Sequence, residues 1–114
     1  MREGKLNEAH QILAETAESF YENGNKIGLV VTLEAMASLK VLIEKFDVAA
    51  YLIGWADKAR EELGDMRWRI EQADVDKIIA ACIDKLGEVA FSDAYEEGKK
   101  MTMDEAVAYA LQES

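Results

Sequence analysis

His10 and Cys82 are the side chains of this sequence that are best suited to chemistry, and each is the only residue of its type. One histidine and one cysteine cannot supply the ligand set of a zinc site. A di-iron bundle is also excluded, because it needs two Glu-x-x-His units and the sequence has none. His10 lies one position off the apolar stripe of its segment, which favours a surface or boundary histidine over a metal ligand. Cys82 falls on an apolar face, where cysteine is typically buried and inert.

The glycines do not form a phosphate-binding loop. Neither G-x-G-x-x-G nor G-x-x-x-x-G-K-[ST] occurs, and the glycines at 24 and 28 are better explained by a turn. We therefore expect no catalytic residue, no metal and no cofactor in this chain. If a larger parent protein binds a nucleotide, its site would lie elsewhere in that parent.

Three aromatic residues, Trp55, Trp68 and Tyr95, are the side chains that a ligand could use. The simplest interpretation is that they anchor helix packing. The alternative is that one or two line a groove for a peptide or small effector, with Arg67 or Arg69 holding an anionic group. Trp68 is the best candidate for partial exposure, because arginine rarely flanks a deeply buried residue unless it is paired. The candidate partner or effector contacts are therefore Trp68, Arg67, Arg69 and Trp55.

The composition is that of an acidic globular domain. The 114 residues include 23 acidic and 13 basic side chains, which gives a net charge of −10. This charge disfavours contact with nucleic acid and with anionic membranes, and it is most simply a solubilising surface. No stretch approaches the length of apolar sequence that a membrane span needs. Residues 1–4 show no signal-peptide pattern, so with a single cysteine we expect a cytoplasmic setting.

Apolar periodicity and the absence of proline predict an all-α chain of about six helices. The expected helices cover residues 6–22, 26–46, 48–63, 74–86 and 88–99, with a short last helix from residue 103. Asp47 is expected to cap the third helix, and residues 66–72 to form a polar connection. Thr102 and Glu105 have the spacing of a capping box for the last helix.

The helix expected at 26–46 is apolar on two faces. One stripe comprises Ile27, Val30, Val31, Ala35, Val41 and Leu42, and the other comprises Leu29, Leu33, Met36, Leu39 and Ile43. A helix that is apolar on two faces must be covered on two faces, so we expect this helix to be the central one. Leu33, Met36, Val41 and Leu42 should then all be buried.

Two further packing expectations concern the second half of the chain. Glycine inside a helix costs roughly 1 kcal/mol relative to alanine, so Gly54 predicts a compensating close approach of another helix. Phe91, Tyr95 and Leu111 should pack the last two helices onto the helix at 74–86.

The last third of the sequence carries its most specific pattern. The segments LGEVAF at 86–91, AYEEG at 94–98 and MTMDEAVAYAL at 101–111 resemble the closing segment of large bacterial signal-transduction ATPases and LuxR/MalT-type transcription regulators. In that family the segment ends a long tetratricopeptide-like array. Residues 24–29, 33–37 and 49–64 resemble its repeat turn and helix motifs, so the likeness covers roughly residues 20–112. Trp55 departs from the alanine that is common there, and the proline that often ends a unit is missing.

The resemblance implies a degenerate, right-handed array of antiparallel helical hairpins that forms one domain over residues 1–114. We expect this domain to be the C-terminal fragment of a larger protein, from which the preceding repeats have been removed. The resemblance also implies that the domain is a non-catalytic protein-interaction or sensor module that caps a helical-repeat arm in a bacterial signalling or transcription regulator. The alternatives are a standalone helical adaptor that dimerises, and a helical domain that binds a small effector.

The partner expected from this interpretation is another protein or the upstream repeats of the same chain, without direct contact to nucleic acid or membrane by this segment. A face that has lost its neighbouring repeat should be apolar and exposed. We expect that face to support a homodimer through the first two helices, with Phe20 and Leu29 in the interface.

Overall fold

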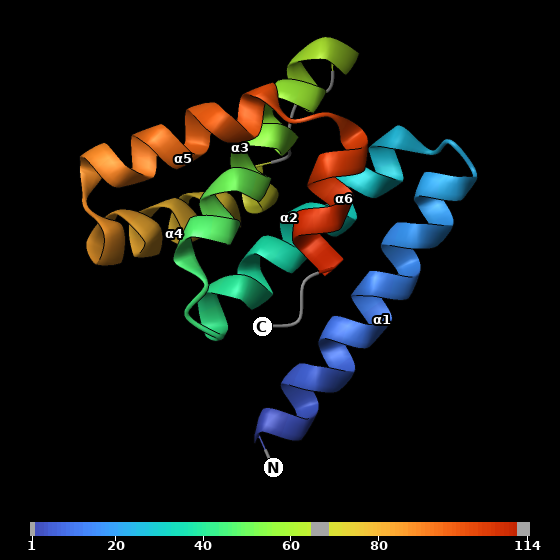
Figure 1. Cartoon of the computed structure of the whole chain (residues 1–114), viewed down its shortest axis with the longest axis horizontal. Helices are drawn as coiled ribbons and strands as arrows, with labels where there is room; N and C mark the ends of the chain where they lie inside the picture. Colours follow the sequence, from blue (N-terminus) through green and yellow to red (C-terminus); the bar gives the residue numbers. More distant parts are fainter. Residues whose placement is uncertain (1, 65–68, 112–114) are drawn as a thin grey trace.

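The computed structural model of the chain describes residues 2–64 and 69–111 and shows an all-α fold. The described residues form six helices and no strand: α1 (Arg2–Glu22), α2 (Lys26–Leu42), α3 (Phe46–Leu63), α4 (Arg69–Leu86), α5 (Glu88–Lys100) and α6 (Met103–Leu111). Successive helices up to α5 run back and forth, with α1 and α5 at opposite edges (Figure 1). The predicted fold class is thereby confirmed.

Glycine ends three of the helices where the sequence indicates a stop. Gly24, Gly64 and Gly87 all have positive φ, the left-handed region that glycine enters without steric cost. The last helix begins at the predicted capping box, in which the Glu105 amide donates to the Thr102 hydroxyl and the Thr102 amide donates to the Glu105 carboxylate.

The prediction of one helix over residues 26–46 is wrong, because the chain turns at residues 43–45. Glu44 has a φ of 63°, the Glu44 amide donates to Val41 and the Lys45 amide donates to Lys40. These are the bonds of a Schellman motif, in which glycine normally takes the left-handed position. Glu44 occupies that position here, so the sequence has no glycine to indicate that the helix ends at this point. Since α3 starts at Phe46 after Lys45, Asp47 lies in the first turn of α3 and is not its cap.

The fourth helix also starts earlier than predicted. Residues 69–72 belong to α4 and not to a polar connection, and residues 66–68 lie outside the described part of the chain. Arginine, isoleucine, glutamate and glutamine are all compatible with a helix, and no glycine or proline separates them from the regular pattern that begins at Asp74.

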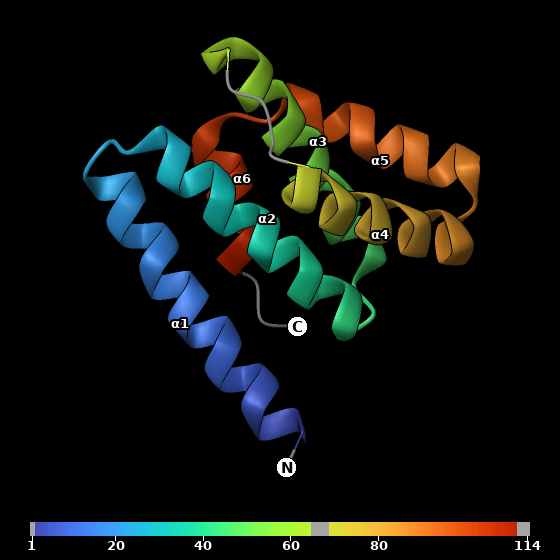
Figure 2. The ribbon, with the colours of Figure 1, turned by 180° about the vertical axis from the view of Figure 1, so that it is seen from behind.

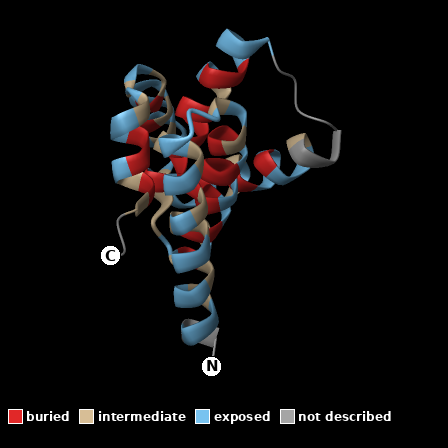
Figure 3. Ribbon diagram, turned by 90° about the vertical axis from the view of Figure 1, so that its right-hand side faces the viewer, coloured by how far each residue is buried: buried red, intermediate tan, exposed pale blue. Residues whose placement is uncertain are grey.

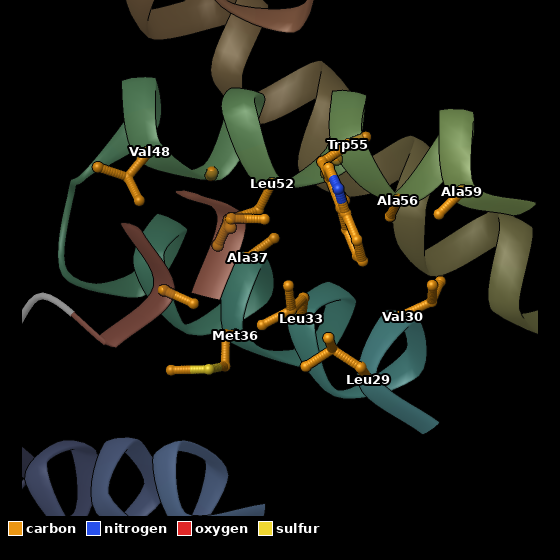
Figure 4. Close-up of a cluster of buried hydrophobic side chains, with 14 of the residues drawn as sticks. Leu29, Val30, Leu33, Met36, Ala37, Val48, Leu52, Trp55, Ala56 and Ala59 are labelled. Carbon is orange, nitrogen blue, oxygen red and sulfur yellow. The ribbon is translucent and has the colours of Figure 1, made fainter. Parts of the chain in front are cut away.

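The central helix is α3 and not α2. It packs most extensively against α5 and α2, and it also contacts α4 and α6. Its buried residues include Leu52, Ile53, Trp55 and Ala56, none more than 4 % exposed. Figure 4 shows Trp55 pointing from α3 toward the side of α2 that carries Val30 and Leu33. Buried residues gather where α2 and α3 meet, whereas the N-terminal half of α1 is largely exposed (Figure 3).

The position of α6 corrects another expectation. We expected the last two helices to pack onto α4, but α6 packs mainly on α3, α1 and α2, and of the two it is α5 that packs on α4. Figure 1 shows α6 crossing in front of α2, and the Tyr21 hydroxyl of α1 donates to the Asp104 carboxylate at the start of α6. The C-terminal helix therefore folds back onto the N-terminal half, which differs from the sequential stacking of a solenoid end cap.

Two glycines allow α3 and α5 to cross at close range, as the position of Gly54 predicts. A β-carbon at Gly54 would overlap the backbone carbonyl oxygen of Tyr95, and a β-carbon at Gly98 would overlap the carbonyl oxygen of Tyr51. The arrangement is reciprocal, because each glycine receives the backbone of the residue three positions before the other glycine. Ala50 and Ala94, which precede the glycines by one helical turn, are both buried.

We predict that Gly54→Ala and Gly98→Ala each destabilise the fold by about 1–3 kcal/mol or more, because the added methyl group meets backbone that cannot rotate away. Gly4→Ala is the matched control, since Gly4 is also helical but has nothing within 4 Å of an added β-carbon. It should leave stability unchanged or raise it by up to about 1 kcal/mol. Denaturant melts of the three variants measure these differences, and equal melts would contradict the proposed packing.

Candidate functional site

The helix α2 differs from an ordinary surface helix, because it buries both of its mid-helix charges and also exposes several apolar residues. Its charged residues are Lys26, Glu34 and Lys40, and all of α2 is described. Glu34 is 8 % exposed and Lys40 is 1 % exposed, so only Lys26 in the first turn reaches the surface. An amphipathic helix normally keeps its charges on the solvent side.

The solvent side of α2 carries Ile27, Val31, Ala35, Ser38 and Leu42, which we call the outward face. Ile27 is 52 % exposed, Val31 45 % and Leu42 54 %. Figure 2 shows α2 in front of α6, between α1 and α4. The outward face therefore forms one uncharged row along the whole helix.

This result corrects the expectation that both stripes of α2 are covered. Leu33 and Met36 are fully buried as predicted, but Val41 is only partly buried and Leu42 is exposed. The stripe with Leu33 faces α3 and the core, whereas most of the other stripe faces solvent. One apolar face of α2 is therefore not covered by the described residues.

A groove runs along the edge of the outward face, between α2 and α4. It has a volume of about 550 Å³ and is lined by Val31, Glu34, Ala35, Ser38, Val41, Leu42, Asp74, Val75, Lys77 and Ile78. The lining is mainly apolar, with polar side chains at a few positions, which is the usual character of a binding groove. We call it the α2–α4 groove.

Glu34, which lines the α2–α4 groove, belongs to a buried ion pair. The Arg60 guanidinium of α3 donates through Nε and Nη2 to the two carboxylate oxygens of Glu34, both at 2.8 Å. The two side chains are 6 % and 9 % exposed. A bidentate pair of this kind fixes geometry as well as charge, so it sets how α2 is rotated about its axis relative to α3.

His10 is buried, which corrects its assignment to the surface or boundary. It is 8 % exposed, and its Nε2 lies 3.3 Å from the Nζ of Lys40. An ammonium group only donates, so Nε2 accepts this hydrogen bond. His10 also lines a second cavity of about 540 Å³ between the first half of α1 and the C-terminal end of α2. The hydrogen bond between Lys40 and His10 thus joins α2 to α1 at a buried position.

Cys82 is fully buried, as its position on an apolar face predicts. Its Sγ donates to the carbonyl oxygen of Phe46 at 3.5 Å. Burial raises the pKa of the Cys82 thiol to about 11, with a further contribution from the Asp47 carboxylate. The thiolate, which is the nucleophilic form, is therefore scarce at neutral pH.

Trp55 is the one residue predicted to contact a partner whose side chain is described, and it does not line the α2–α4 groove. Trp55 is 4 % exposed and belongs to the core, as expected if it anchors helix packing. Arg67 and Trp68 lie outside the described residues, and Arg69 begins α4 with a side chain that is also not described. Sequence reasoning missed Glu34 and Arg60, although an isolated glutamate in an otherwise apolar stretch of helix is the signal that could have identified them.

The residues proposed for a dimer interface are also placed elsewhere. Leu29 is fully buried, and the Phe20 ring lies against Gly28, where it would be 2.7 Å from an added β-carbon. These side chains hold α1 and α2 together.

No protein-family model, curated protein or solved structure matches this chain. Among the described residues, no group of three or more histidine, cysteine or acidic side chains is arranged to hold a metal ion. The same residues include no helix with the length and apolarity needed to cross a membrane.

We predict that Glu34→Ala destabilises the fold by about 3–5 kcal/mol, because it leaves the Arg60 charge buried without its bidentate acceptor. The matched control is Glu96→Ala, which breaks an exposed pair to Lys99 at 3.7 Å and should cost no more than about 1 kcal/mol. Denaturant melts at neutral pH measure both. If Glu34→Ala melts like Glu96→Ala, the pair does not fix α2.

Proposed function

We propose that this chain is a non-catalytic protein-interaction module that docks a partner on the outward face of α2 and in the adjoining α2–α4 groove. The observation that carries the proposal is the exposed apolar row of α2, on a helix whose mid-helix charges are buried. Glu34 and Lys40 are buried, while Ile27, Val31 and Leu42 are each at least 45 % exposed. The inner side of α2 is apolar as well, with Leu29, Leu33 and Met36 fully buried, so the core does not account for the apolar residues on the outer side.

A contiguous apolar row on an otherwise charged surface is typical of a binding site. The chain is 32 % charged, yet the outward face has no charged residue over the length of α2. Single exposed apolar residues are common and need no explanation, whereas a row of them rimmed by polar residues marks an interaction surface.

The resemblance to LuxR/MalT-type regulators supports a more specific setting. In that setting the chain is the C-terminal part of a helical-repeat sensor arm in a bacterial signalling or transcription regulator, and the docking partner is a protein or another part of the parent. A standalone adaptor that dimerises through the outward face is the second candidate. The reading frame upstream of Met1 separates the two, because an in-frame nucleotide-binding domain supports the sensor arm and a stop codon supports the adaptor.

Because we propose that the outward face serves binding and not folding, it should tolerate polar substitution. We predict that Leu42→Ser changes the free energy of unfolding by no more than about 0.5 kcal/mol. Leu33→Ala, on the buried side of the same helix, should cost about 2–5 kcal/mol. Denaturant melts compare the two variants. A large loss of stability in Leu42→Ser would mean that the outward face belongs to the core.

Site-specific photo-crosslinking tests the docking face directly. A photo-reactive amino acid in place of Ala35, on the outward face, should give a discrete protein adduct in the cells that produce the chain. The same residue in place of Ala90, an exposed alanine of α5, is the matched control and should give none. Val31→Glu should abolish the adduct at position 35. The proposal fails if position 35 gives no adduct, or if both positions give the same adducts.

A further inference from the structure

The cavity between the first half of α1 and the C-terminal end of α2 is a second candidate site, and we call it the α1–α2 cavity. It has a volume of about 540 Å³, which lies within the range of about 300–1,000 Å³ that small-molecule sites occupy. None of its described lining residues lines the α2–α4 groove, so the two sites are separate.

The charge of the α1–α2 cavity is opposite in sign to that of the chain. Lys45 is the only lysine, arginine or acidic residue among its described lining residues, although the chain has 23 acidic side chains against 13 basic ones. Lys45 is partly buried and forms no ion pair with a described residue. Its neighbour Glu44 is exposed and lies outside the lining. A partly buried cation without a partner favours an anion in the cavity.

His10 contributes a hydrogen-bond donor to the same cavity. It is 8 % exposed, and it is one of the lining residues. Because Nε2 accepts from the Lys40 ammonium, the neutral ring carries its hydrogen on Nδ1. No described residue accepts a hydrogen bond from Nδ1. A buried donor without an acceptor costs free energy, which an acceptor in the cavity would recover.

Lys40 makes the His10 donor stronger. Its ammonium lies 3.3 Å from Nε2 and withdraws electron density from the ring. Hydrogen bonds that follow one another in a chain polarise each other, so the Nδ1–H group becomes a better donor to an anion. A hydrogen bond to an ionised acceptor is also stronger than one to a neutral acceptor. His10 is therefore better suited to a negatively charged oxygen than to a carbonyl group.

The other lining residues define the rest of the ligand. Leu6 of α1, Leu39 of α2 and Ile43, which follows α2, give the cavity an apolar part. The side-chain amides of Asn7 and Gln11 provide further donors near its polar part. One unpaired cation balances one negative charge, which favours a carboxylate over a doubly charged phosphate group.

We propose that the α1–α2 cavity binds a small organic monocarboxylate with an apolar body. The carboxylate accepts hydrogen bonds from Lys45 and from Nδ1 of His10, and the apolar body packs against Leu6, Leu39 and Ile43. The site goes beyond the docking face on α2 and does not depend on it. A bound ligand would contact α1 and α2 at once and so hold the first half of α1 against the rest of the fold.

The test is an NMR titration of the intact chain with three probes. Octanoate has both features of the proposed ligand, octanamide has the same length without the charge, and inorganic phosphate has charge without an apolar body. His10 is the only histidine, so its ring nitrogen signals report on the cavity without overlap. Octanoate should shift the Nδ1 signal until it saturates and should bind at least about tenfold tighter than either control.

Two results of this titration would overturn the inference. If octanamide or phosphate binds as tightly as octanoate, the cavity does not recognise an anion with an apolar body. If octanoate leaves the His10 ring signals in place, it does not bind in the α1–α2 cavity.

A pair of charge-matched variants separates a specific contact from general attraction. Lys45→Gln and Lys58→Gln each remove one positive charge, and Lys58 is an exposed residue of α3 outside the lining. Lys45→Gln should weaken octanoate binding at least about tenfold, whereas Lys58→Gln should leave it unchanged. Equal losses in the two variants would show that Lys45 does not hold the carboxylate.

A second pair keeps the test decisive if Lys45→Gln no longer melts cooperatively. Asn7→Trp fills the α1–α2 cavity from an exposed position of α1, and Ser19→Trp adds the same side chain at an exposed position of α1 outside the lining. Asn7→Trp should abolish the saturable shift with octanoate, and Ser19→Trp should retain it. Binding that survives Asn7→Trp would place octanoate elsewhere and overturn the inference.

Discussion

The close crossing of α3 and α5 is the constraint on which the rest of the fold depends. With a side chain at position 54 or 98, the two helices would have to separate, because the atoms they would meet are backbone carbonyl oxygens. At the observed distance, α3 has α5 on one side and still contacts α2, α4 and α6. Tyr95, whose backbone lies at the crossing, also donates a hydrogen bond from its hydroxyl to Asp57 and so links the two helices a second time. A single helix at the centre explains how a chain of this length buries a continuous core.

The rotation of α2 follows from its contacts with α3 and α1. The Glu34–Arg60 pair fixes α2 to α3, and the hydrogen bond between Lys40 and His10 fixes it to α1. These two contacts act together with the burial of Leu29, Leu33 and Met36, and Val31 and Leu42 are left facing outward. A buried ion pair is weak support for stability in itself, since apolar residues of the same volume can stabilise as well. Fixing the rotation of α2 is therefore the better account of why charges lie in this interior.

Much of the fold could be predicted, because glycine stops, the capping box and apolar periodicity act locally. The turn at Glu44 could not, since a glutamate in the left-handed region leaves no local signal. The packing of α6 on α1, α2 and α3 could not be predicted either, because periodicity indicates which face is buried but not what buries it. The pairing of Glu34 with Arg60, 26 residues apart, is likewise invisible in a pattern that assigns charges to the surface. The α2–α4 groove was missed for the same reason.

The outward face and the acidic surface together explain how such a face can be both exposed and selective. An uncharged row of apolar side chains is prone to indiscriminate association, including association with further copies of the chain. A net charge of −10 opposes self-association through long-range repulsion, while the uncharged row itself stays free for a close contact. On the proposed function, a partner has to fit closely around the small Ala35 and Ser38 and also has to approach a chain of net charge −10. Attraction to the right partner and repulsion of the wrong one are both needed for discrimination, and here they come from different residues.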